Sequence, residues 1–133
     1  YQAKQDDLLK PNHLNPDLVR WELHRVWVVE ATLKPGKRHI YAKRTFYLDE
    51  DSWTALAADQ YDAKGRLYRA SFAHMSPSYD AKTPNAETQA FYDLTSGVYN
   101  VSFLMGPYDG VRYTNPLPAN QWSPDALAGA GIR

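Results

Sequence analysis

The chain has no cysteine and only two methionines among its 133 residues. The absence of cysteine excludes disulfides and thiolate metal sites, although it does not identify a compartment. Fifteen basic and fifteen acidic side chains balance each other, and no block of like charge occurs. The sequence therefore offers no stripe for nucleic acid and no polybasic membrane arm. No apolar run approaches the roughly 18 residues of a membrane-spanning helix.

Apolar and aromatic side chains are plentiful, at 44% and 14% of the residues. This content and the length predict a single folded domain over residues 1–133. Residues 1–17 are polar and contain Pro11 and Pro16, so we expect a linker with little fixed structure there. Because the chain begins with Tyr1 rather than Met, we interpret it as a processed or excerpted piece whose export signal can lie outside it.

The clearest β pattern runs through residues 20–51, where large apolar side chains alternate with mixed ones. Residues 34–37, Lys-Pro-Gly-Lys, have the composition of a turn. A hairpin closed by this turn sets Leu33 opposite Arg38, Trp27 opposite Arg44 and Leu23 opposite Leu48, so that the apolar sets of both strands share one face.

The pattern further predicts a second hairpin, from residues 52–62 and 66–76, with Gly65 in the left-handed position of its loop. Its best pairing matches Leu56 with Phe72, Tyr61 with Leu67, and Asp59 with Arg69 as a cross-strand ion pair.

Residues 76–87 have the Pro, Asn and Ser content of a loop that crosses a sheet end or acts as a lid. A third hairpin is predicted around residues 95–97, with an amphipathic helix over 86–94 as the rival. Ser123 and Pro124 predict the start of a short C-terminal helix that Gly129 or Gly131 ends.

No catalytic constellation is visible. The four histidines, His13, His24, His39 and His74, are scattered without metal-ligand spacing, and surface or half-buried hydrogen bonding is the better interpretation for His24 and His74. The acids of residues 49–51 are consecutive on a strand end, so they point in alternating directions and suit a solvated turn better than calcium. We therefore expect no enzyme, no metal and no cofactor.

Two arginines on the predicted apolar face, Arg25 and Arg44, need an explanation. In one, each lays its stem on the apolar surface, stacks on Trp27 and pairs with a carboxylate from another element. In the other, they hold the anionic head of an amphiphile whose tail the aromatic walls accept. The predicted ligand-binding residues are the walls Trp21, Leu23, Trp27, Val29, Ile40, Phe46 and Leu48, with Arg25 and Arg44 at the rim.

Three stretches resemble a known family. The runs NPDLVRWELHRVWVVEATLKPGKRHIYAKRTFYLDEDSW, ADQYDAKGRLYRA and WSPDALAGAGIR are similar to the C-terminal part of the bacterial domain-of-unknown-function family thirteen-twenty-nine. Members are longer exported proteins, similar to outer-membrane lipoprotein-sorting proteins of the LolA and LolB type. The resemblance implies a mainly β fold: a curved antiparallel sheet, open or half-barrel, with the short helix at its C-terminus.

The resemblance also implies a function. We expect a periplasmic protein, or one at the periplasmic face of the outer membrane, that binds or carries a lipid-like molecule beside a membrane transporter. The alternative is a structural interaction module whose apolar face packs on a missing N-terminal region or a partner chain. If the chain holds only part of a sheet, an unpaired edge strand invites a second copy and a homo-oligomer.

Overall fold

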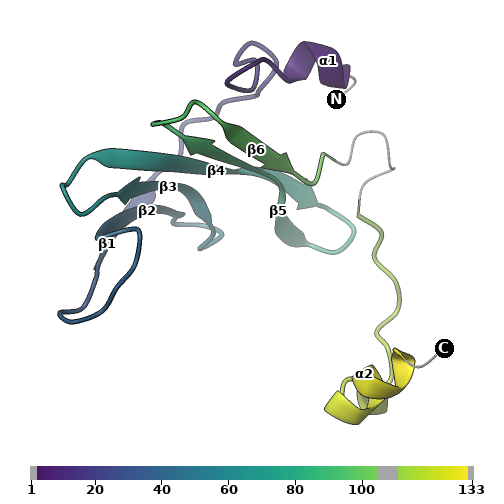
Figure 1. Ribbon diagram of the computed structural model, residues 1–133. Coiled ribbons are helices and arrows are strands. Elements are labelled where there is room, and N and C mark those ends of the chain that lie inside the picture. The colour runs from purple at the N-terminus through teal and green to yellow at the C-terminus, as the bar shows by residue number, and fades with distance from the viewer. Residues whose placement is uncertain (1–2, 105–110, 132–133) are drawn as a thin grey trace.

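The fold is a single antiparallel sheet of six strands, seen in the computed structural model of Figure 1, which describes residues 3–104 and 111–131. Each strand pairs with the next along the chain. The strands are β1 (Val26–Thr32), β2 (Lys43–Asp49), β3 (Ala55–Tyr61), β4 (Leu67–Ser78), β5 (Thr83–Asp93) and β6 (Tyr99–Ser102). The expected mainly β, open antiparallel sheet with a short C-terminal helix is confirmed.

The first hairpin forms with a different register from the expected one. Trp27 pairs with Leu48 rather than Arg44, and Arg44 pairs with Ala31. The predicted turn of residues 34–37 forms, since the Lys37 N–H donates to the Lys34 carbonyl at 3.1 Å and Gly36 has a φ of 75°. The predicted pairing directly beside the turn is wrong, because strand pairing stops at Thr32 and Lys43 and the connection between them is wide. In that loop the Tyr41 backbone N–H donates to His39 Nδ1 at 3.0 Å, which turns the chain aside. The shift is an even number of residues, so the two apolar sets still share a face.

The second hairpin follows the prediction only near its turn. Tyr61 pairs with Leu67 and Gly65 has a φ of 75°, as expected. A bulge at Gln60 and Tyr61 then shifts the register, so Ala57, not Leu56, lies opposite Phe72. The predicted ion pair between Asp59 and Arg69 is wrong for the same reason.

The carboxylate and the guanidinium of that pair have other partners. Asp59 accepts a hydrogen bond of 2.9 Å from the Tyr47 hydroxyl. Arg69 reaches Asp93 instead, at 3.4 Å.

Residues 76–87 are not a long loop, because β4 and β5 continue through them and leave a turn of residues 79–82. Pro77 and Pro84 pair with each other beside this turn. Because proline has no backbone N–H, the two positions that cannot donate a strand hydrogen bond both lie at the end of the hairpin. The rival helix over 86–94 is wrong as well, since residues 86–93 belong to β5. The third hairpin is confirmed by the pairing of β5 with β6, where Gly97 has a φ of 73°.

The N-terminal residues have more structure than a linker. Helix α1 (Gln5–Leu8) precedes a bridge between Leu9 and Leu14, and α1 lies near β6 in Figure 1. Leu14 is only 6% exposed, and the Tyr99 hydroxyl donates to the Lys10 carbonyl at 2.6 Å. The expectation of little fixed structure in residues 1–17 is therefore wrong. We call residues 9–21, which pass over β5 and β4, the strap.

The C-terminal helix is confirmed. Helix α2 (Pro124–Ala130) is capped by the Ser123 hydroxyl, which accepts from the Ala126 N–H at 3.1 Å, and Gly131 is its C-cap. A 3-10 turn, η2 (Ala119–Gln121), precedes it. Figure 1 shows α2 apart from the sheet, and its Leu127 is exposed.

Candidate functional site

The two faces of the sheet carry different candidate sites. Phe46 pairs with Ala58, and Ala58 pairs with Ser71, so these three share a face. Phe72 follows Ser71 in β4 and therefore points to the other face. The first face we call the arginine face, which consists of Trp27, Val29, Arg44, Phe46 and Leu48. The second lies beneath the strap and we call it the strap face.

Five of the nine predicted binding residues lie together on the arginine face. The strand pairing sets Trp27 beside Leu48 and Val29 beside Phe46. Trp27 stacks on Trp53, with ring centroids 6.5 Å apart and planes 14° apart. Trp27 is 54% exposed, so it is not part of an interior core in this chain. The result is an open apolar strip along β1 and β2.

A cationic cluster lies at one end of this strip. The Arg44 guanidinium lies 5.0 Å from the centre of the Tyr41 ring, and that of Arg69 lies 5.9 Å from it. Arg69 Nη1 donates to the Tyr41 hydroxyl at 2.9 Å, and this bond is the first cause of its raised pKa. Asp93 partly offsets the Arg69 charge.

Arg44 differs from Arg69 in its partners. Its Nη2 lies 3.4 Å from His39 Nε2, and within residues 3–104 and 111–131 it has no carboxylate partner. Arg44 does not stack on Trp27, as one sequence interpretation assumed, but on Tyr41. Arg44 therefore combines a position on an apolar face with a charge that no carboxylate of the described residues neutralises.

The other predicted residues lie elsewhere. Arg25 precedes β1, and its Nε donates to Glu50 at 2.7 Å, so its charge is paired as in the structural explanation. Leu23 and Ile40 lie outside the strands and are exposed. Trp21 belongs to the strap and lies on the opposite face from Trp27.

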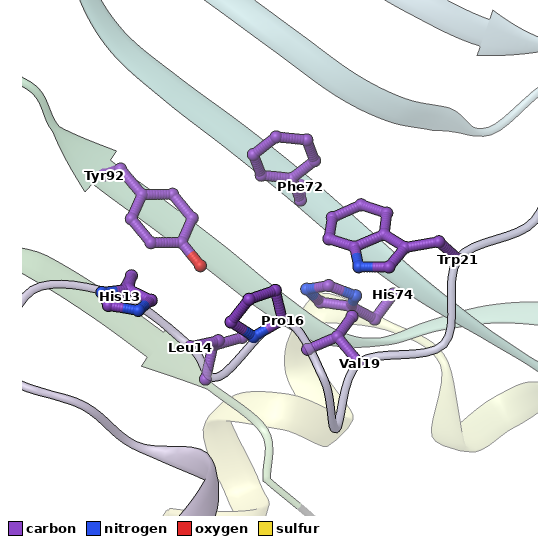
Figure 2. Close-up of a pocket in the computed structure, with 8 residues that line it drawn as sticks. All are labelled: His13, Leu14, Pro16, Val19, Trp21, Phe72, His74 and Tyr92. Atoms are coloured by element: carbon purple, nitrogen blue, oxygen red, sulfur yellow. The ribbon is translucent and has the colours of Figure 1, made fainter.

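A pocket on the strap face collects side chains from the strap and from β4 and β5 (Figure 2). Its volume is about 270 Å³. Trp21 lies edge-on to Phe72, with ring centroids 5.9 Å apart, and 6.3 Å from the His74 ring. The complete lining is His13, Leu14, Pro16, Val19, Trp21, Phe72, His74 and Tyr92.

Hydrogen bonds and one charge cluster hold the strap in place. The Tyr92 hydroxyl bonds to the backbone of Leu14. Beyond Trp21, His24 Nδ1 lies 3.0 Å from Asp49 Oδ1, and Asp49 Oδ2 accepts from the Ser52 hydroxyl at 2.7 Å. The Ser52 hydrogen bonds lower the pKa of Asp49, and the bond to Asp49 raises that of His24.

Sequence reasoning missed the other lining residues of both sites. Tyr41 and Arg69 join Arg44 only through tertiary contact, and nothing in the spacing of their positions indicates it. His74 and Phe72 alternate along β4, which was a usable signal for a shared face. This alternation gave no indication that the strap covers Phe72 and His74.

Two absences concern the described residues. Within residues 3–104 and 111–131, no cluster of three or more His, Asp or Glu side chains could hold a metal ion. In the same ranges, no helix has the length and apolar character needed to cross a bilayer.

The chain belongs to the family described as "Protein of unknown function (DUF1329)", whose model matches residues 1–128. An uncharacterised protein of Pseudomonas aeruginosa, PA3922, is 45% identical over 134 residues. This match covers 99% of the chain but spans only 29% of the relative's length. The expected family is thereby confirmed.

Two solved structures are similar. The first is a domain from Vibrio parahaemolyticus, provisionally named an outer-membrane lipoprotein-sorting protein domain. It is 25% identical with a TM-score of 0.51, and the match covers 78% of this chain and 42% of that one. The second is a DUF1329 family protein from Desulfovibrio piger, 21% identical with a TM-score of 0.49, covering 77% of this chain and 40% of that one. The lipoprotein-sorting likeness of the fold therefore rests on the Vibrio domain.

Proposed function

We propose that this DUF1329 protein binds a lipid-like amphiphile on the arginine face and carries it without changing it chemically. The apolar tail lies along Trp27, Phe46 and Leu48, and the anionic head contacts Arg44 beside Tyr41. A guanidinium binds a carboxylate or phosphate with two parallel hydrogen bonds, which suits such a head.

One observation carries the proposal: an exposed apolar strip ends at a guanidinium that has no carboxylate partner in the described ranges. Half-exposed Trp27 and the stacked Trp53 are costly to leave in water unless something covers them. Arg25, by contrast, is paired with Glu50. Arg44 has an aromatic neighbour and no such pair, which leaves its donors available to a ligand.

The setting follows from resemblance. The name of the similar Vibrio domain concerns lipoprotein sorting at the outer membrane, a process of the bacterial envelope. This resemblance supports our proposal that the carrier works in the periplasm or at the periplasmic face of the outer membrane, where it exchanges its ligand with a membrane transporter.

The test is to purify the full-length natural protein, extract what co-purifies, and identify it by mass spectrometry. The Trp27→Ala, Arg44→Ala double variant is expected to lose a stoichiometric amphiphile that the wild type retains. Arg44→Ala alone should change the free energy of unfolding by less than about 1.5 kcal/mol, because its contacts are partly solvated.

The matched control is the Val28→Ala, Lys43→Ala double variant. These residues neighbour Trp27 and Arg44 in sequence but point to the other face, where Lys43 pairs with Glu30. The control should keep the amphiphile. A wild-type protein that carries no amphiphile, or equal losses in both double variants, contradicts the proposal.

A second candidate function is that of a structural interaction module. It rests on the same exposed strip and on the share of the Pseudomonas relative's length that this chain covers. Because the chain spans 29% of its Pseudomonas relative, a longer protein has ample residues to cover the arginine face. In that case Trp27 is shielded in the full-length protein, and Trp27→Ala lowers its stability by several kcal/mol without any ligand effect. Hydrogen exchange of β1 in the full-length protein separates the two candidates.

A further inference from the structure

The pocket beneath the strap has a largely apolar lining, in which His13, Trp21, His74 and Tyr92 carry the polar atoms. Of these, the Tyr92 hydroxyl is already bonded to the Leu14 backbone. His13 is exposed at the rim. His74 projects from β4 and lies between Trp21 and Val19 in Figure 2.

One ring nitrogen of His74 has no hydrogen-bond partner among the described residues. This atom, Nε2, is shielded from solvent. Buried polar atoms in folded proteins are nearly always bonded, so an exception beside a cavity calls for an explanation.

The charge state of the pocket restricts what can fill it. Burial lowers the pKa of His74, so the ring is neutral at pH 7 and offers one donor and one acceptor. None of the eight lining residues is a lysine, an arginine or a carboxylate. A charged head group would lose its hydration here without gaining an opposite charge.

We propose that this pocket binds the end of a lipid-like molecule that carries an uncharged hydroxyl or carbonyl group, with His74 as its hydrogen-bond partner after a turn of the ring brings the shielded Nε2 to the cavity. Trp21 and Phe72 form the apolar walls. A volume of about 270 Å³ is at the lower end for small-molecule pockets, so one short chain or ring is accommodated. The site is on the opposite face from Arg44 and does not depend on the function proposed for the arginine face.

The probes are 1-octanol and octanoate, which share a chain and differ in the charge of the polar end. Each is titrated into the full-length protein at pH 7.5, with the histidine side-chain nitrogens followed by NMR. The His74 signal, identified by its loss in His74→Gln, is expected to shift with 1-octanol and not with octanoate. His74→Phe should weaken 1-octanol binding about tenfold, since it removes the hydrogen bond but keeps a ring.

Two further variants complete the test. His74→Gln keeps a donor and an acceptor and should retain more of the affinity than His74→Phe. Val28→Ala, far along the sheet on β1, should bind 1-octanol as the wild type does. A His74 signal that is unmoved at saturating 1-octanol overturns the proposal, and so does equal affinity for octanoate. This readout uses the wild type, so it decides even if His74→Phe does not fold.

Discussion

The two halves of the sheet differ in what lies against them. Over β4, β5 and β6 the strap supplies a cover, and Ala90 beneath it is fully buried. On β1, adjacent residues that point to opposite faces are both exposed, Trp27 at 54% and Val28 at 60%. A single exposed apolar residue is normal on a protein surface. An edge strand that exposes apolar side chains on both of its faces is unusual.

The difference shows which half of the sheet is covered by residues of the same chain. The covered half is stabilised by contacts within the chain, so substitutions there should act on stability. The open half has apolar surface that the described residues do not cover, so substitutions there should act mainly on binding. Substitutions in the covered half and near its border are expected to have the largest effects on stability.

The largest effect is expected at Leu14, the buried side chain of the strap. Leu14→Ala should lower the free energy of unfolding by about 2 to 4 kcal/mol, because it leaves a cavity against the sheet. The control is Leu18→Ala, in the same strap but 45% exposed, which should cost less than about 1 kcal/mol. Urea unfolding measures both. Equal effects would mean that the strap does not form the cover described here.

A smaller effect is expected at Asp49, which binds His24 in the segment between the strap and β1. Asp49→Asn replaces a buried acceptor of bonds from Ser52 and His24 and should cost about 1 to 3 kcal/mol. Asp51→Asn, two residues away and exposed, should change stability by less than about 0.5 kcal/mol. Thermal unfolding of both variants is the measurement. A stable Asp49→Asn variant would show that the end of the strap needs no anchor.

Sequence reasoning recovered the sheet because its evidence was local. For the paired residues of β1 and β2, alternation fixed which side chains share a face, and an even register shift left that result intact. Trp21 was assigned to the wrong face, because it lies before β1 and packs on Phe72. The register itself failed because the loop before β2 is wide, and its Tyr41 bonds both to His39 nearby and to Arg69, 28 residues away, a contact that no local pattern contains.

The candidate sites were harder to predict for the same reason. Residues 9–17 of the strap were taken for part of a linker, since their anchors, Tyr92 and Tyr99, come about 80 to 90 residues later and long-range contacts are invisible to periodicity. His74 looked like an ordinary half-buried histidine until the strap placed Trp21 above it.

The smallest effect is a pH dependence of the contact between His24 and Asp49. The pKa of His24 is raised, first by its hydrogen bond to Asp49, so the protonated ring is favoured in the folded protein. Its stabilisation is fully present below the unfolded pKa of about 6.5 and is lost as pH rises through the higher folded value.

The measurement compares wild type with His24→Gln. The stability difference between them should be greatest near pH 6 and shrink toward pH 9. The same comparison for His39→Gln, in the loop before β2, corrects for histidine loss in general. A His24→Gln difference that is constant over this range would mean that the ring contributes by neutral hydrogen bonding alone. The end of the strap would then hold equally well at every pH at which Asp49 is ionised.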